Sequence, residues 1–513
     1  MNKTPNATIS FFGGVGSVTG ANFMLAGERT KILIDCGLIQ GERFAHAANR
    51  EPFAYDPASV DYLFVTHAHI DHIGRIPKLV KEGFRGKIFS TPQTLELARL
   101  MLPDAFSVLM SELPQGEETL YNKEDIERAF LLWEGMPYHQ VFSAGEFEVV
   151  MKDSGHILGS AMFEICRNTE QKRKVVFTGD LGNAPTPLLN EAETAAGATY
   201  LVLESVYGDR NHEGEGLRKE RLAEVIHANA KHGGVLLIPC FSLEKTQVLL
   251  YEMDDLLAQK KIPNVPVFLD SPLAIKVTDV YRRSKEFFNE EAKARMRKED
   301  DIFSFPNLRI TLGANESREI PGSPNPKIII AGSGMSAGGR ILDHERRYLG
   351  DPRNTILFIG YQAVGSLGRQ IQEGIKKVRI NHENVRVRAS IETITGYSSH
   401  MDGEHLLQFT GRAAESGALK RVFVVMGEPR SALFLGSSRP SVGANVTLRL
   451  LQAHFALIVC TSGLHKLQHA EWWAGFTFWY ALMPPFETTV EQARAYAANP
   501  NSFLSFLSLG AYL

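Results

Sequence analysis

Residues 66–72 read THAHIDH and directly follow the apolar run YLFV at positions 62–65. Three imidazoles and one carboxylate therefore fall within the six positions from His67 to His72. A buried strand that ends in this pattern and turns toward a helix points alternate side chains in different directions. His67 and His69 can then share one ion while Asp71 and His72 face a second one. So many ligand-type residues at one strand end predict a metal site rather than solvated or core histidines.

The remaining ligands have to come from the ends of other strands. The segment DSGHILGSA (153–161) offers His156, and VVFTGD (175–180) offers Asp180. Asp35, which ends KILID (31–35), is a candidate for orienting a ligand through a hydrogen bond. Imidazole and carboxylate donors without thiolate favour Zn²⁺ and leave Mn²⁺ or Fe²⁺ open.

Composition limits the class of protein. With 513 residues, of which 44% are hydrophobic and 22% charged, the chain fits a soluble protein of two or three domains. A net charge of −3 provides no whole-protein basic field, so nucleic-acid contacts need a local patch. The four cysteines, Cys36, Cys166, Cys240 and Cys460, form neither a disulfide framework nor a thiolate metal site. Together with a start that lacks an apolar signal segment, they predict a cytoplasmic protein.

The pattern of secondary structure changes along the chain. Short strands separated by glycine-containing turns over residues 8–65 predict two packed sheets. From about 206 to 395, the order of buried strand, small-residue turn and helix recurs, which predicts a mostly parallel α/β sheet inserted into the first domain. The stretch after 435 has few charges and a tryptophan-rich segment at 472–486 that is too short for a membrane span. We therefore expect no membrane partner.

Several motifs carry a family resemblance. THAHIDHIGRIP (66–77), GHILGSA (155–161), FTGDLG (177–182) and VLESVYGDR (202–210) resemble the signature of the metallo-β-lactamase superfamily. LDSPLA (269–274), SGMSAGGR (333–340) and GYSSHMD (396–402) narrow the resemblance to β-CASP nucleases of the RNA-processing type. These are similar to the mRNA 3′-end cleavage and polyadenylation nuclease and its prokaryotic relatives. The resemblance extends from about residue 8 to about residue 435.

The resemblance implies an α/β fold in which a metallo-β-lactamase αββα sandwich holds an inserted parallel α/β β-CASP domain. The expected segments are 1–205 for the first part of the lactamase domain, 206–395 for the insertion, 396–435 for the returning part, and 436–513 for a divergent tail of unknown role.

The resemblance also implies a two-zinc site and assigns roles to its residues. One zinc is expected on His67, His69 and His156, and the other on Asp71 and His72, with Asp180 bridging the two. A hydroxide between the metals would attack phosphorus. The catalytic residues are then Asp71, Glu204 and His400, with Glu204 orienting His400 as the general acid.

Substrate phosphate is expected at the insertion. The loop AGSGMSAGGR (331–340) follows a buried strand and precedes a helix, so its backbone N–H groups can approach an anion. The candidate contacts are Ser333, Gly334, Arg340 and Lys245. Glu244 and Lys245 stand where relatives usually show Gly and Arg, and lysine lacks the bidentate fork of arginine. The basic run GIKKVRINHENVRVRAS (374–390) is either ordinary solvated charge or a phosphate track.

Met426 departs from the family pattern. Relatives of the RNA type carry a zinc-ligating histidine just before the Gly-Glu at this point, whereas a thioether is a poor zinc ligand. We therefore expect a weakened second zinc site. The DNA-processing branch of the family also lacks this histidine.

The function that follows is a zinc-dependent ribonuclease acting on single-stranded RNA. The alternatives are a DNA-processing β-CASP nuclease with single-stranded DNA as partner, or a catalytically weakened RNA-binding paralogue. A small-molecule hydrolase such as a thioesterase or lactamase is a third class, and the large insertion argues against it. The sequence leaves a homodimer open.

Overall fold

The computed structural model describes residues 7–41, 45–113, 116–167, 173–299, 301–362 and 365–437. Cys460 and the tryptophan-rich segment lie outside the described residues, so the expectations for the tail beyond residue 437 are not addressed. None of the described helices has the length and apolar character that crossing a membrane requires.

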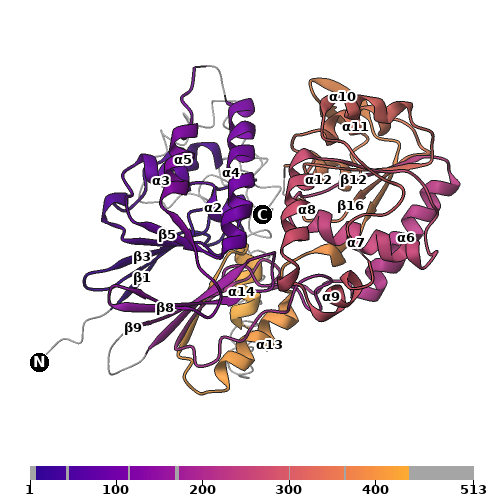
Figure 1. The fold of residues 1–513 in the computed structure, drawn as a ribbon. Coiled ribbons are helices and arrows are strands. Elements are labelled where there is room, and N and C mark those ends of the chain that lie inside the picture. Colours follow the sequence, from indigo (N-terminus) through magenta and orange to yellow (C-terminus); the bar gives the residue numbers. More distant parts are fainter. Residues whose placement is uncertain are drawn as a thin grey trace, which may run out of the picture. The chain divides into compact units, whose positions relative to one another are not determined.

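Two six-stranded sheets pack face to face (Figure 1). The first has the order β1 (Thr8–Gly13), β2 (Asn22–Ala26), β3 (Lys31–Ile34), β4 (Tyr62–Phe64), β5 (Lys87–Ser90), β6 (Trp133–Gly135). The second has the order β20 (Arg421–Val425), β11 (Tyr200–Glu204), β10 (Lys174–Phe177), β9 (Ala161–Arg167), β8 (Phe147–Asp153), β7 (Val141–Ala144). Aromatic residues from both inner faces form the core between them, such as Phe64 and Phe163 with ring centroids 5.3 Å apart.

Helices cover the outer faces of this sandwich. The first sheet carries α1 (Ala45–Arg50), α2 (Ile70–Ile73), α3 (Ile76–Lys81), α4 (Pro92–Glu112), α5 (Lys123–Leu131) and the short 3₁₀ turn Pro57–Ser59 on its side of the molecule. The second sheet is covered by α13 (Gly403–Ala414), whose Leu406 and Phe409 pack on Val176 and Leu203, and by α14 (Pro429–Ser437). The expected αββα sandwich is confirmed.

A third, all-parallel sheet lies between β11 and β20 in the chain. Its order is β14 (Leu308–Ile310), β13 (Val267–Asp270), β15 (Lys327–Ala331), β12 (Val235–Pro239), β16 (Thr355–Phe358), β19 (Ser390–Thr393). Because β11 and β20 pair directly, with Glu204 opposite Val425, the chain leaves the second sheet and returns to the adjacent position. The inserted parallel domain is therefore confirmed.

Both faces of the inserted sheet are covered, as a parallel sheet requires. One face packs against α6 (Glu215–Lys231), α7 (Lys245–Ala258) and α8 (Pro272–Arg283). The other packs against α11 (Ile341–Tyr348), α12 (Leu367–Gln372) and a hairpin of β17 (Lys377–Ile380) and β18 (Glu383–Arg386). The remaining elements are α9 (Glu290–Met296), α10 (Ala314–Glu319) and the 3₁₀ turns Lys285–Phe287, Ile320–Gly322 and Thr395–Tyr397.

Candidate metal centre

The candidate ligands lie at strand ends that meet at one edge of the sandwich. His67 and His69 lie between β4 and α2, and Asp71 and His72 lie in the first turn of α2. The other candidates come from more distant elements: His156 from the β8–β9 loop, Asp180 after β10, Glu204 at the end of β11, and His400 between the turn Thr395–Tyr397 and α13. The structure thus brings all of the predicted metal and catalytic residues together.

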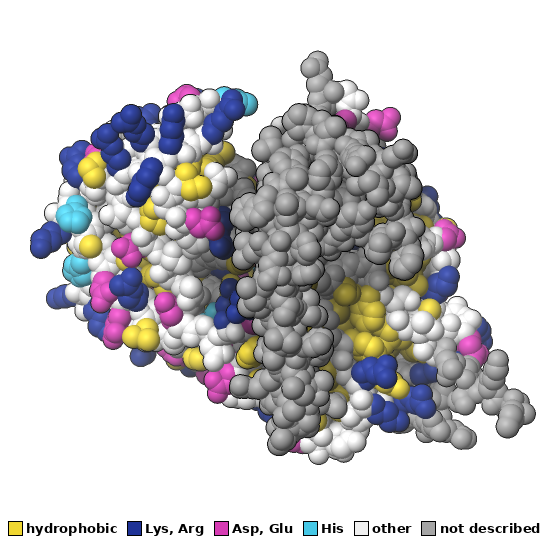
Figure 2. Space-filling model, turned by 180° about the vertical axis from the view of Figure 1, so that it is seen from behind, with side chains coloured by type: hydrophobic (Ala, Val, Ile, Leu, Met, Phe, Trp, Pro, Cys, Tyr) yellow, Lys and Arg dark blue, Asp and Glu magenta, His cyan; other side chains and the backbone are white. Residues whose placement is uncertain are grey.

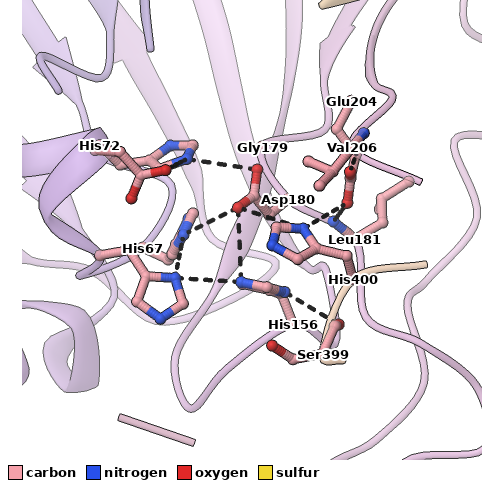
Figure 3. A network of polar contacts seen from close by, with 12 residues as sticks. His67, His72, His156, Gly179, Asp180, Leu181, Glu204, Val206, Ser399 and His400 are labelled. Carbon is pink, nitrogen blue, oxygen red and sulfur yellow. Dashed lines mark hydrogen bonds and ion pairs between the residues drawn. The ribbon is translucent and has the colours of Figure 1, made fainter. Parts of the chain in front are cut away.

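Four of these residues converge on one point (Figure 3). His69 Nδ1 lies 3.0 Å from His67 Nε2 and 3.3 Å from His156 Nε2. Asp180 Oδ2 lies 3.5 Å from His67 Nε2 and 3.6 Å from His156 Nε2. A tetrahedral metal with bonds of ~2.0–2.1 Å needs donor atoms separated by roughly 3.3 Å. The four donors therefore have the spacing that one tetrahedral ion requires.

Hydrogen bonds on the side of the ring that faces away from the cluster determine which ring nitrogen faces the four-donor cluster. His67 Nδ1 lies 3.0 Å from Thr66 Oγ1, and His156 Nδ1 lies 3.1 Å from the Ser399 carbonyl oxygen. A proton on each Nδ1 satisfies these contacts and leaves Nε2 as a bare lone pair. Burial is the largest cause that lowers the pKa of all three imidazoles, to about 3 for His69. The rings are thus held in the neutral form that binds metal.

Asp71, His72 and the Oδ1 side of Asp180 form the second half of the centre, and the first half is the cluster of three imidazoles with Asp180 Oδ2. Asp35 holds the second half in place. Its Oδ2 atom lies 2.8 Å from His72 Nδ1 and accepts a hydrogen bond of 2.8 Å from Thr66 Oγ1. Burial alone would lower the pKa of His72, but the carboxylates of Asp180 and Asp35 raise it well above its usual range. His72 Nε2 lies 3.4 Å from Asp180 Oδ1 and 3.9 Å from Asp71 Oδ2.

Two buried atoms of this half, His72 Nε2 and Asp180 Oδ1, lie 3.4 Å apart but make no hydrogen bond, with each other or with any other described residue. Buried polar atoms without partners are costly, and here both face the same space. A divalent ion satisfies both atoms, so the residues present fit a second metal. Because Asp180 Oδ2 faces the first cluster and Oδ1 faces His72, its carboxylate can bridge two ions.

His400 and Glu204 form a pair next to Asp180. Glu204 Oε1 accepts a hydrogen bond of 2.7 Å from Leu181 N and lies 3.5 Å from His400 Nδ1. Burial alone would lower the pKa of His400, but the carboxylates of Glu204 and Asp180 raise it above its usual value. Glu204 is fully buried, whereas the His400 side chain is 21% exposed. The pair therefore offers a partly accessible imidazole whose protonated form is favoured.

Met426 lies directly after β20, behind His72. It is buried, its φ of 48° is in the left-handed region, and its N–H donates to the Gly14 carbonyl. Its sulfur lies against Gly14, it belongs to the same core cluster as Phe23, and the side chain lines a small cavity together with Asp35 and His72. The thioether thus packs in the core beside the second half of the centre.

The predicted phosphate contacts differ in their availability. Lys245 lines a cavity with His156 and Ser399, its Nζ lies 4.7 Å from the ring centroid of Phe241, and it makes no ion pair within the described part of the chain. Arg340 instead donates 2.6 Å to Asp270 Oδ1 and 2.9 Å to the Thr311 carbonyl. Its guanidinium is occupied by an internal network.

The loop that contains the other two candidates packs closely. A side chain at Gly334 would collide with the ring of Phe241, and Ser333 donates nothing to the metal residues but accepts a hydrogen bond from Ala337 N. The phosphate roles of Ser333, Gly334 and Arg340 stay predictions.

The sequence did not indicate three residues that position the centre. Thr66 bridges Asp35 and His67, Ser399 holds His156 through its carbonyl, and His212 Nε2 lies 3.0 Å from the His400 carbonyl oxygen. Thr66 and Ser399 fall within quoted motifs and could have been found by proximity to a ligand. His212 gave no local signal, because its partner lies 188 positions away.

Comparison with known families agrees with this geometry. Residues 24–206 match the profile of the metallo-beta-lactamase superfamily domain, and residues 246–371 match the Beta-Casp domain. Residues 384–437 match the Zn-dependent metallo-hydrolase RNA specificity domain. This last match begins before the third sheet ends, since β19 belongs to that sheet. The exact domain boundaries stay predictions.

Individual relatives span most of the chain. A protein named ribonuclease TTHA0252 from Thermus thermophilus is 35% identical over 438 residues, covering 85% of this chain and 97% of the relative. Transcription termination factors FttA from Methanosarcina mazei and Pyrococcus abyssi are each 29% identical, over 447 and 452 residues, covering 84% of this chain and 68% of each relative. With the three profiles in chain order and a relative above 30% identity, the chain belongs to the β-CASP family of the metallo-β-lactamase superfamily.

Proposed function

We propose that this protein is a zinc-dependent ribonuclease that hydrolyses phosphodiester bonds of single-stranded RNA. The observation that carries the proposal is the convergence of three neutral imidazoles and Asp180 next to the Glu204–His400 pair. The names of the relatives, a ribonuclease and transcription termination factors, support RNA as the substrate class.

The donors fit zinc better than they fit Mg²⁺ or Ca²⁺. The ligand atoms are nitrogen and carboxylate oxygen, without the all-oxygen set that Mg²⁺ or Ca²⁺ prefers. The spacing of 3.0–3.6 Å matches tetrahedral coordination. When bound, zinc lowers the pKa of a coordinated water toward neutrality and polarises a phosphate oxygen.

The side chains divide the remaining work. His67, His69 and His156 would hold the first ion and Asp71 with His72 the second, while Asp180 has one carboxylate oxygen toward each group. Lys245, which has no acidic partner among the described residues, places a positive charge beside the cavity that His156 lines.

The leaving oxygen of the cleaved bond needs a proton, and His400 is placed to donate it. Glu204 holds His400 Nδ1 and favours the charged imidazole, so the proton can leave from the accessible side of the ring. Glu204 is a positioning residue in this scheme, because two backbone N–H groups and His400 already occupy its carboxylate.

The test uses end-labelled single-stranded RNA and DNA of matched sequence, with and without a chelator. We expect cleavage of RNA that stops on chelation and returns with Zn²⁺. Comparable cleavage of DNA would favour the DNA-processing alternative, which the absence of a histidine at Met426 supports. Tight RNA binding without cleavage by zinc-loaded protein would favour the weakened paralogue. The intact set of first-site donors argues against that outcome.

A further inference from the structure

The hairpin β17–β18 separates apolar and basic side chains cleanly onto two faces. Val378, Ile380 and Val385 are buried and pack into the core cluster that contains Ile341 of α11 and Ile371 of α12. On the opposite face the exposed residues are Lys377, Arg379 and Arg386, with Asn384 opposite Arg379, and Arg388, two positions after β18 ends, continues the alternation and is also exposed. The period of two along each strand therefore places four cations on one outer face.

This face has no acidic residue to neutralise it. Lys377 pairs directly opposite Arg386, and like charges opposite each other destabilise a hairpin. The nearby acids bind other cations: Glu383 binds Arg346 at 2.8 Å, and Glu373 binds Arg369 at 2.6 Å. Within the described ranges, none of the four outward cations makes an ion pair. Four unpaired cations on one face, in a chain of net charge −3, indicate a binding surface for an anionic partner.

The hairpin lies at the opposite end of the inserted sheet from the metal centre. Arg388 N donates to the Leu349 carbonyl, and β19 begins immediately afterwards at Ser390. The chain then follows β19 to Thr393 and reaches His400 beyond its carboxyl end. A strand of four residues spans about 13 Å, so a ligand at the metal centre has to extend well beyond it to reach the hairpin. Figure 2 shows Lys and Arg side chains gathered at one end of the insertion's surface, with few acids among them.

We infer that the outer face of this hairpin binds the phosphate backbone of the RNA chain whose scissile bond lies at the metal centre. Cations two residues apart on a strand repeat every ~6.8 Å and form two adjacent rows that a regularly charged backbone can follow. Arginine and lysine contacts to phosphate carry no sequence information, so the hairpin contributes affinity for long RNA without base preference. The inference rests on the proposed function for its choice of RNA.

Binding measurements separate this surface from the centre. Zinc-loaded protein with His400→Ala, which keeps the RNA intact, is titrated with fluorescent single-stranded RNAs of about 6 and about 30 nucleotides over a series of salt concentrations. The variants are Lys377→Gln/Arg386→Gln and, as a second independent pair, Arg379→Gln/Arg388→Gln. The control is Lys260→Gln/Arg353→Gln, which removes the same charge from exposed sites outside the hairpin.

Each hairpin pair is expected to weaken binding of the long RNA about 5- to 20-fold while leaving the short RNA unchanged. Two lost phosphate contacts also reduce the slope of log Kd against log salt by about 1.4, since each contact to a single strand contributes ~0.7. The control pair is expected to change the long-RNA affinity less than two-fold.

Unchanged long-RNA affinity in both hairpin pairs would overturn the inference, as would an equal loss for both RNA lengths. If the hairpin variants bind RNA as before but no longer bind an acidic polyglutamate peptide, the face binds a protein partner. That result would also overturn the inference. Cleavage of the short RNA by the otherwise wild-type protein tests the proposed function separately, because the proposed chemistry uses only residues of the metal centre and none of the hairpin.

Discussion

The two halves of the metal centre share Asp180 but differ in their donors. The first half has three imidazoles from two separate loops, hydrogen bonds behind the rings of His67 and His156, and four donor atoms that lie within 4.8 Å of one another. The second half has His72 and Asp71, while the neighbouring strand end contributes the thioether of Met426. A position can therefore be fully buried and well packed, as Met426 is, and still leave a metal short of a ligand. We expect one tight and one weak zinc equivalent.

The largest effect is expected from removing a donor of the first half. His69→Ala should lose the first ion and with it RNA cleavage. Removing a residue that only hydrogen-bonds to a metal ligand costs up to ~10²-fold, and removing the ligand itself should cost far more. Metal analysis and cleavage rates check this. His232→Ala, an exposed histidine after α6, is the control. Full activity in metal-free His69→Ala protein would remove the first half from the mechanism.

Next in size is the loss of His400, which belongs to neither half. His400→Ala should lower the cleavage rate ~10²- to 10⁴-fold with both zinc equivalents retained, because a general acid contributes that much. Rates and metal content are measured together, with the exposed His232→Ala again as the control. Loss of zinc in His400→Ala would reassign His400 as a ligand.

A smaller effect is expected from repairing the second half. Met426→His should tighten the second zinc equivalent about 10- to 100-fold and raise activity at limiting zinc, provided that the ring faces His72. Histidine is among the residues that tolerate the left-handed backbone found here, φ 48°. Zinc titration by calorimetry measures both equivalents.

Met426→Leu is the matched control for that repair, since it keeps an apolar side chain beside Gly14 in the core without adding a ligand. Two equally tight equivalents in the wild-type protein, and no gain from the histidine, would show that another group completes the second half.

The smallest effect concerns a contact between the insertion and the first half. The Tyr281 hydroxyl accepts a hydrogen bond of 3.2 Å from Leu158 N, two residues after His156, and donates to the buried carboxylate of Glu244. Tyr281→Phe should weaken the first zinc equivalent several-fold, and at most ~10-fold, without changing the second. Tyr121→Phe is the control, because the buried Tyr121 hydroxyl has no hydrogen-bond partner among the described residues. Equal weakening of both equivalents would mean a general loss of stability rather than a contact specific to the His156 loop.

Local patterns predicted the fold well where each element is encoded by its own residues. The strands predicted over 8–65 are present but all belong to the first sheet, whereas the second sheet of the sandwich comes from later residues; repeated strand-turn-helix units predicted the parallel insertion. The pairing of β11 with β20 could not be read from the sequence, because it joins residues more than 200 positions apart. Arg340 shows the same limit, since its partner Asp270 lies 70 positions away.

The sequence by itself determined which side chains could hold a metal, because ligand chemistry belongs to residue type and the strand ends supply it in recognisable motifs. Only the tertiary structure decided which atom of each side chain faces the site. Thr66 and Ser399 select Nε2 of His67 and His156, and Asp35 does the same for His72. Those choices depend on hydrogen bonds whose geometry is set by packing between distant elements. Spacing along the chain does not encode them.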